Sequence, residues 1–231
     1  MRRLRVPPLV IVLVAGVVAL SARELTTPAG QSWDGLLLAL AFAFSLVVPV
    51  PIAILASRQV DPEYHGNGWI LAHTAGVRAG RLCRAKFVVT GAVTSVATLF
   101  AAGSVAVAGR LGGIAAGFPP AWWLGWVAAV AVVNLVLLAL HLVLSAWVEN
   151  QLVGLGVGVL GVFIGATASA FPTWVTHLTP WGYYTLLRPA DFAADGELVP
   201  LDPAYPSVVV LGLAGATAFG LLTHRLDRQE V

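Results

Sequence analysis

The sequence predicts an all-α, polytopic membrane protein with six transmembrane helices and with the N- and C-termini in the cytoplasm. Three observations predict this fold: the composition, six long apolar stretches, and an uneven distribution of basic residues. Of the 231 residues, 58% are hydrophobic and only 10% are charged, whereas soluble domains carry roughly 25% charged residues. A water-soluble globule of this size could not hide so much apolar surface. Lipid is therefore the expected solvent for much of the chain.

The apolar stretches define the predicted spans. A helix needs about 20 apolar residues to cross a hydrocarbon core of roughly 30 Å, and only helical backbone satisfies its own hydrogen bonds in lipid. Pro49 and Pro51 remove backbone donors and predict a kink in the second span. One transmembrane domain, 1–231, is expected, with a cytoplasmic loop at 58–86 and an outer loop at 172–206. The six predicted spans are residues 6–22, 36–57, 87–108, 122–147, 152–171 and 207–223.

The basic residues predict the orientation. With the N-terminus inside, ten of the thirteen Lys and Arg residues face the cytoplasm, and only Arg23, Arg110 and Arg188 face outward, as the positive-inside rule requires. All eight tryptophans fall near span ends or in flanking loops, which is typical of the aromatic belts at membrane interfaces. We expect a multi-pass protein of the bacterial cytoplasmic membrane. The net charge of +2 gives no indication of a nucleic-acid partner.

The first predicted span has a second interpretation. Arg2, Arg3 and Arg5, the short apolar run after them and a small-residue end also fit a signal peptide. We expect an uncleaved span, and the orientation of the other five spans is the same in both cases.

The sequence lacks the patterns of a membrane enzyme. The His-Glu-x-x-His and Gly-x-Ser-x-Gly motifs are absent. Four of the five histidines lie in loops or at span ends and are divided between the two faces, so the five cannot all converge on one metal. The single cysteine, Cys83, excludes an internal disulfide. The chain also lacks the Gly-rich nucleotide-binding loop that ends in Lys-Ser/Thr, and its only lysine is Lys86. We expect no catalytic residue, no metal and no cofactor in this chain.

One polar stripe lies inside the fourth predicted span. Asn134, His141 and Ser145 are spaced so that they share one helical face. A polar stripe within a membrane is a candidate functional path. The alternative, which we favour, is a seam of interhelical hydrogen bonds, each worth about 0.6 kcal/mol. A membrane enzyme centred on His141 and Asn134 is the least favoured alternative, because no carboxylate lies at the same depth.

The fifth predicted span carries two Gly-x-x-x-Gly spacings. Glycines at this spacing let two helix backbones approach closely, so that dispersion contacts hold them together. Packing within one subunit and dimerisation are equally compatible with the pattern. The four positions are Gly154, Gly158, Gly161 and Gly165.

The predicted cytoplasmic loop is the most unusual stretch. Asp61 and Glu63 precede Gly66, and Trp69 and Ile70 follow it. An exposed turn that carries an aromatic and apolar patch among charges suits the groove of a partner protein. A basic run follows, which we expect to contact lipid headgroups. Its members are Arg78, Arg81, Arg84 and Lys86.

Six spans, cytoplasmic ends, the acid–glycine–aromatic loop and the closing Ala85-Lys86 resemble an ABC-2-type transporter permease. Within that family the chain is most similar to the small permeases of lantibiotic-immunity and bacitracin-export transporters. The outer segment adds to the likeness, because it is similar to the proline–aromatic element of such permeases between spans five and six. Its residues are Pro180, Trp181, Tyr183, Tyr184 and Arg188.

The resemblance implies a function and partners. The chain would be the permease subunit of an ATP-driven ABC exporter that moves or expels an antimicrobial peptide or another amphipathic compound. It would pair with a second permease, identical or a sister chain, while a separate ABC ATPase holds ATP and Mg²⁺. The ATPase would receive the loop around Glu63, Gly66 and Trp69 as a coupling helix, and the outer element would shape the exit. The alternative is a non-transporting accessory subunit that assembles or stabilises a membrane complex.

Overall fold

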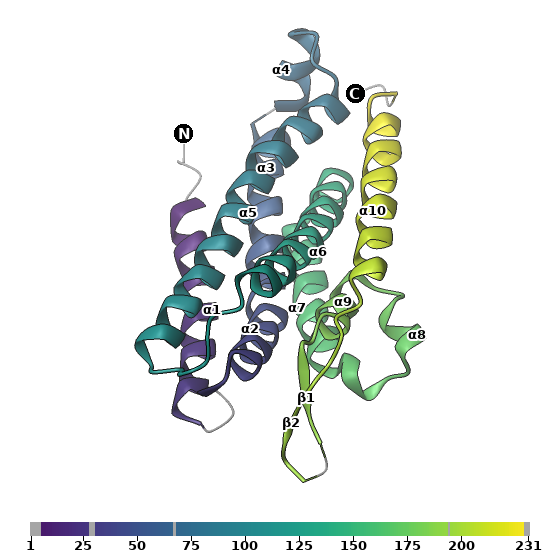
Figure 1. Cartoon of the computed structure of the whole chain (residues 1–231). Helices are drawn as coiled ribbons and strands as arrows, with labels where there is room; N and C mark the ends of the chain where they lie inside the picture. Colours follow the sequence, from purple (N-terminus) through teal and green to yellow (C-terminus); the bar gives the residue numbers. More distant parts are fainter. Residues whose placement is uncertain (1–5, 28–30, 67, 194, 229–231) are drawn as a thin grey trace.

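The computed structural model describes residues 6–27, 31–66, 68–193 and 195–228, which are mainly helical (Figure 1). Arg2, Arg3 and Arg5, which carry part of the predicted charge bias, lie outside these residues. The long helices are α1 (Val6–Arg23), α2 (Trp33–Val47), α3 (Pro49–His65), α5 (Ala79–Leu111), α6 (Pro120–Trp147), α7 (Gln151–Thr167) and α10 (Tyr205–Leu226). The short elements are η1 (Glu24–Thr26), α4 (Gly68–Thr74), η3 (Ala168–Ala170), α8 (Thr173–Thr176), η4 (Pro180–Gly182), α9 (Tyr183–Leu186), β1 (Ala190–Phe192) and β2 (Leu198–Pro200).

The described residues contain five helical segments that are long and apolar enough to cross a membrane: α1 with η1, α5, α6, α7 with η3, and α10. The pair α2–α3 meets the same criterion only when the two helices are taken together, and they are bent by 42° at the break between them. The fold is therefore a multi-pass helical bundle with five or six candidate spans.

The kink predicted from Pro49 and Pro51 is confirmed, and it divides the second predicted span into two helices at Val48. Pro49 is the first residue of α3, where its missing N–H costs no helical hydrogen bond. Pro51 cannot donate to the carbonyl of Val47 and its ring crowds that position, so α2 cannot continue straight through. The break places a bend inside the apolar layer.

The segment predicted as a cytoplasmic loop, 58–86, is helical over most of its length. Helix α3 continues to His65, α4 follows it, and α5 begins at Ala79. The predicted span bounds gave no helix ends in this segment, because these turns lie beyond the apolar band, where hydrophobic length carries no information about helix ends. The outer segment 172–206 was likewise not all loop, since it contains α8, η4, α9 and the antiparallel β1–β2 hairpin.

Helix α5 is longer than a bilayer requires. Its 33 residues span about 50 Å at 1.5 Å per residue, against a hydrocarbon core of roughly 30 Å. Large apolar side chains are exposed along it from Val88 to Leu111. The first two turns of α5 therefore extend beyond the apolar band, and they lie at the same end of the molecule as α4 and the end of α3 (Figure 1).

Helix α6 lies at the centre of the bundle. It packs against α3, α5 and α10, while α1 packs against α2 and α5, and α3 also packs against α7. Its inward side chains are fully buried, and they include Trp126, Leu137 and His141. Helix α10 ends at the same end of the molecule as α4, whereas the β1–β2 hairpin and α8 lie at the opposite end (Figure 1).

Half of the tryptophans are interior residues and not members of an interfacial belt. Trp33, Trp123, Trp126 and Trp181 are all buried, whereas the belt interpretation requires their rings to face the headgroups. Trp33 and Trp123 form an edge-to-face cluster with Phe118 at the end of the bundle opposite α4, with ring centroids 5.0 to 5.9 Å apart. Aromatic side chains near a span end therefore pack into the protein here.

The glycine spacings of α7 are used for packing within the subunit. Gly154, Gly158, Gly161 and Gly165 are all buried. A Cβ atom on Gly158 would lie 2.7 Å from Cβ of Ala53 in α3, and one on Gly161 would lie 2.0 Å from Nε1 of Trp181. These contacts bring α7 against α3 and against the outer segment.

Gly161→Ala is expected to destabilise the fold by about 2 kcal/mol, because its new methyl group overlaps the rigid Trp181 ring. Thermal unfolding in detergent would measure the effect as a lower midpoint. Gly156→Ala is the matched control, since Gly156 lies on the same helix with nothing within 4 Å of the added Cβ. An unchanged midpoint for Gly161→Ala would contradict this packing.

Candidate functional site

The candidate site is the end of the bundle formed by α3, α4 and the start of α5. The last turn of α3 is fastened to the turn between α6 and α7. Tyr64 Oη donates a hydrogen bond to the carbonyl oxygen of Ala146 (2.6 Å), and Gln151 Nε2 donates to the Asp61 carboxylate. His65 Nδ1 lies 3.1 Å from the same carboxylate. Asp61 thus binds a neighbouring part of its own chain.

An ion pair joins α3 to α5. Lys86 Nζ donates hydrogen bonds to the Glu63 carboxylate and to the carbonyl oxygen of Gln59. The side chains of Lys86 and Glu63 are only 13% and 12% exposed. In this low-dielectric position an unpaired charge would be costly, so each partner requires the other. Lys86 therefore holds two helices together and is not the headgroup anchor that its place in a basic run predicted.

Helix α4 packs over the Glu63–Lys86 ion pair. Gly68 passes so close to Glu63 that an added Cβ would lie 2.1 Å from Oε2. Trp69 packs edge-to-face on Tyr64 with ring centroids 6.1 Å apart, so it is partly buried and not fully exposed as predicted. The exposed apolar residues of α4 are Ile70 (55%) and Leu71 (65%). Sequence reasoning singled out Ile70 but missed Leu71.

Gly66 ends α3, and Gly76 allows the turn from α4 into α5. The backbone N–H of Gly66 donates to the carbonyl oxygen of Pro62 (3.0 Å), and a Cβ there would lie 2.7 Å from the same oxygen. Gly76 has φ of +73°, a conformation that other residues rarely adopt. The two glycines determine where α4 lies relative to α3 and α5.

The end of α10 is attached to the start of α5. Arg84 donates hydrogen bonds to the Asp227 carboxylate (2.9 Å) and to Thr223 Oγ1 (3.1 Å), and the backbone N–H of Arg81 donates to Asp227 (3.1 Å). A Cβ on Gly80 would lie 1.8 Å from the Thr223 carbonyl oxygen, so only glycine allows this approach. Arg84, like Lys86, makes an internal contact in place of the predicted headgroup role.

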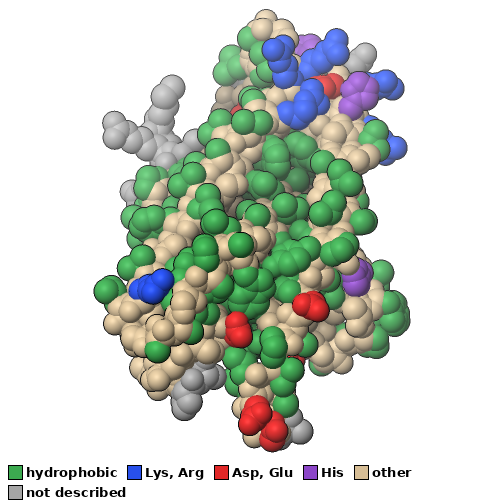
Figure 2. All heavy atoms as spheres, viewed as in Figure 1, with side chains coloured by type: hydrophobic (Ala, Val, Ile, Leu, Met, Phe, Trp, Pro, Cys, Tyr) green, Lys and Arg blue, Asp and Glu red, His purple; other side chains and the backbone are tan. Residues whose placement is uncertain are grey.

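Burial alone would raise the pKa of Asp227, but the hydrogen bonds from Arg84 and from the backbone of Arg81 hold that pKa below its ordinary value. The ionised carboxylate is therefore the form that the fold favours. Arg78 and Arg81 are exposed, and their contact with lipid headgroups stays a prediction. Figure 2 shows Lys and Arg side chains gathered over this end of the molecule and acidic side chains at the hairpin end.

The polar residues of α6 do not form one continuous path. Asn134 donates to Thr98 Oγ1 in α5 (2.9 Å) and accepts from Tyr184 Oη in α9 (2.6 Å). These bonds form the kind of interhelical seam that was the favoured alternative. Ser145, near Gly154, is also buried. His141 is fully buried against the Trp181 ring, and its two ring nitrogens have no hydrogen-bond partner among the described residues.

The outer element folds back into the bundle. Pro180 begins η4, which packs Trp181 against α7 and α6, while Tyr183 and Tyr184 are buried in α9. Arg188 lies 4.5 Å from the centre of the Phe42 ring and 3.2 Å from the Asp191 carboxylate. This element thus joins α2, α6 and α7 at the end of the bundle opposite α4. Among the described residues no cluster of three His, Cys, Asp or Glu side chains could hold a metal ion.

The helical bundle defines a multi-pass membrane protein, and its candidate site is the protruding α3–α4–α5 end with the exposed residues Ile70 and Leu71. The sequence profile described as ABC-2 family transporter protein matches residues 2–165, which is well over half of the chain. The chain therefore belongs to the ABC-2 family of transporter proteins. A comparison with curated proteins finds no match.

Family membership establishes the general role. An ABC-2 permease is a transport component of the membrane that works with an ABC ATPase and is not itself an enzyme. The matched residues include α1 to α6 and most of α7, and with them the whole α3–α4–α5 end. The outer element and α10 lie beyond the match.

Glu63→Gln and Lys86→Met are each expected to destabilise the fold, because each leaves its partner charge or polar group unpaired in a nearly buried position. The double variant should lose less stability than the two single variants lose together, and the difference is a coupling energy of about 1–3 kcal/mol. A double-mutant cycle on thermal or denaturant unfolding in detergent measures it. Glu197→Gln, an exposed acid at the opposite end, is the control. Additive single effects would contradict the pair.

Asp227→Asn is expected to lower the unfolding midpoint at pH 7. The folded-state pKa of Asp227 lies below its ordinary value of 3.8, so its stabilisation is present above that pH and is lost as the pH falls through the folded pKa. The difference between wild type and variant should therefore shrink below pH 3.8. Asp202→Asn, an exposed acid, should show no such pH-dependent difference. A constant difference down to acid pH would contradict the assignment.

Proposed function

We propose that this chain is the membrane-spanning permease subunit of an ATP-driven ABC exporter, and that it moves or expels an antimicrobial peptide or another amphipathic compound. The family supplies the permease role. The coupling to an ATPase is supported by α4, a short helix that exposes Ile70 and Leu71. The ion pair between Glu63 and Lys86 lies directly beneath this helix. Such an apolar tip at a basic end of the molecule suits the groove of an ATPase subunit.

Coupling requires α4 to move together with the spans. Glu63 and Lys86 join α3 to α5 beneath α4, and Tyr64 joins α3 to the last turn of α6. A force applied to α4 therefore passes into three long helices at once. The α2–α3 break at Val48 gives α3 a point about which it can tilt relative to α2. ATP-driven closure of two ATPase subunits would supply that force.

The roles of the predicted coupling residues change accordingly. Asp61, Glu63 and Gly66 position α4, because their side chain or backbone contacts are made within the chain. Trp69 packs α4 onto Tyr64. The direct contacts to the ATPase then belong to Ile70 and Leu71, and an Ala substitution of Glu63 would test folding more than coupling.

A path for the substrate fits best between two permease subunits, identical or sister chains. Inside one chain, Asn134 uses its amide to bind Thr98 and Tyr184 and closes the polar seam upon itself. The exposed apolar faces of the bundle, by contrast, can meet a second copy or lipid. An accessory subunit without transport remains the alternative, and it predicts a bound ATPase whose hydrolysis the chain does not change.

Leu71→Ser and Ile70→Ser are each expected to lower the amount of ABC ATPase that co-purifies with the chain by about tenfold, and to lower the stimulated ATP hydrolysis by the same factor. This is the effect expected when an interface loses an apolar side chain that anchors it. Leu178→Ser is the matched control, because Leu178 is equally exposed (70%) near the opposite end. Unfolding midpoints should stay unchanged for all three. Wild-type complex formation and hydrolysis in both α4 variants would contradict the proposal. Complex formation without stimulated hydrolysis in the wild type would favour the accessory alternative.

A further inference from the structure

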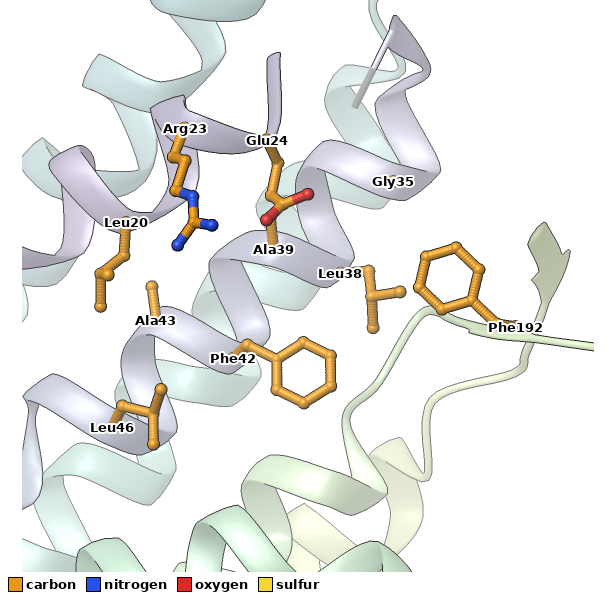
Figure 3. A pocket seen from close by; sticks show the side chains of 10 residues that line it. All are labelled: Leu20, Arg23, Glu24, Gly35, Leu38, Ala39, Phe42, Ala43, Leu46 and Phe192. Carbon is orange, nitrogen blue, oxygen red and sulfur yellow. The ribbon is translucent and has the colours of Figure 1, made fainter. Parts of the chain in front are cut away.

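A groove of about 260 Å³ lies among the end of α1, one face of α2 and the β1–β2 hairpin (Figure 3), at the end of the molecule opposite α4 (Figure 1). Its floor is one face of α2, where Gly35, Ala39 and Ala43 follow each other at intervals of four residues. Residues at this spacing lie one above the other on a helix, and eight residues span about 12 Å. Larger apolar side chains form the walls of this trench: Leu20, Leu38, Phe42, Leu46 and Phe192.

Two opposite charges lie at the mouth of the groove. Arg23 is the last residue of α1 and Glu24 is the first residue of η1, and Figure 3 shows both side chains directed into the space above the α2 face. Neither has an ion-pair partner within the described part of the chain. Among the described residues, the Glu24 carboxylate accepts a hydrogen bond from Thr27 Oγ1 at 3.3 Å, and a carboxylate can accept several.

The groove is amphipathic along its length. Its charged mouth lies where α1 ends, and its apolar trench follows α2 toward the break at Val48. In a membrane this arrangement places the charges at the headgroup level and the trench in the hydrocarbon layer. Phe42 is kept at the wall by the Arg188 guanidinium, 4.5 Å from its ring centre. The groove therefore matches a molecule whose headgroup carries one positive and one negative charge and whose tail is long and apolar.

We propose that this groove binds one zwitterionic phospholipid with a primary amine, of the phosphatidylethanolamine class. Arg23 binds the phosphate, Glu24 accepts hydrogen bonds from the ammonium group, and one acyl chain fills the trench over Ala39 and Ala43. Charge-assisted hydrogen bonds of both signs are the strong contacts of such a site. The site lies far from α4, so it stands independently of the proposed coupling to an ATPase.

Other occupants fit the mouth less well. A phosphatidylcholine headgroup has no N–H to donate to Glu24. A phosphatidylglycerol headgroup carries the same phosphate but offers Glu24 only neutral hydroxyl groups, so no positive charge balances the carboxylate. A cationic peptide would place positive charge beside Arg23. A second copy of the chain on this face would have to supply two charges of opposite sign at the same spot.

The test is lipid titration of the full-length protein in detergent, followed by native mass spectrometry with phosphatidylethanolamine, phosphatidylcholine and phosphatidylglycerol of matched chains. One phosphatidylethanolamine should be retained about tenfold more tightly than either of the others, as expected for one additional hydrogen bond to a charged group. Glu24→Gln should remove this preference without weakening the retention of phosphatidylcholine. Arg23→Gln should weaken both zwitterionic lipids. Ala39→Leu, which fills the trench, should abolish retention of all three.

Asp202→Asn and Arg110→Gln are the matched controls, since they remove one charge of each sign at the same end of the molecule outside the groove, and they should retain phosphatidylethanolamine as the wild type does. Equal retention of the three lipids, or a preference that survives Glu24→Gln, would overturn the proposal. A preference for phosphatidylglycerol would identify an anionic-lipid site instead. Loss of a dimer in Ala39→Leu without any change in lipid retention would show that a second copy covers this face.

Discussion

The ion pair between Glu63 and Lys86 is the interaction on which the protruding end of this protein depends. It lies just beyond the apolar band, where α3 and α5 leave the membrane layer, and both side chains are nearly buried. A charge in such a place is stable only with its partner. Because the pair fixes α3 against α5, it also fixes the helix α4 between them. The position of α4 thus depends in part on one nearly buried contact between α3 and α5.

The two ends of the bundle are built on different principles. At the α4 end, side chains of opposite charge join α3 to α5 and α5 to α10. At the other end, buried aromatic rings and neutral hydrogen bonds hold the elements together, as with Trp33, Trp126 and Tyr184. Charged contacts suit helices that extend into water, and aromatic contacts suit an end that folds back into the bundle. In the interior, His141 contacts the Trp181 ring, and neither its ring nitrogens nor Nε1 of Trp181 has a hydrogen-bond partner among the described residues.

Apolar length located the long helices well, because a lipid core requires long apolar helices. The helices α1, α6, α7 and α10 begin and end within a few residues of the predicted bounds. The helical ends of α3 and α5 were missed, since no apolar run marks a helix outside the membrane. The site was predicted only in part. Asp61, Glu63 and Ile70 were found from the unusual composition of their segment. Arg84 and Asp227, however, are separated by 143 positions in the sequence, and no local pattern predicts that such distant residues form an ion pair.

The central claim is that α4 is the surface through which an ATPase drives this permease. Cys83 is the only cysteine and is buried, so a Cys83→Ala background with Ile70→Cys provides one reactive thiol on α4. The most direct measurement is disulfide or bifunctional cross-linking of that thiol to the ABC ATPase in the assembled complex. The account predicts a permease–ATPase adduct from Ile70→Cys and none from Leu178→Cys. Adducts from neither position, or from Leu178→Cys alone, would contradict it.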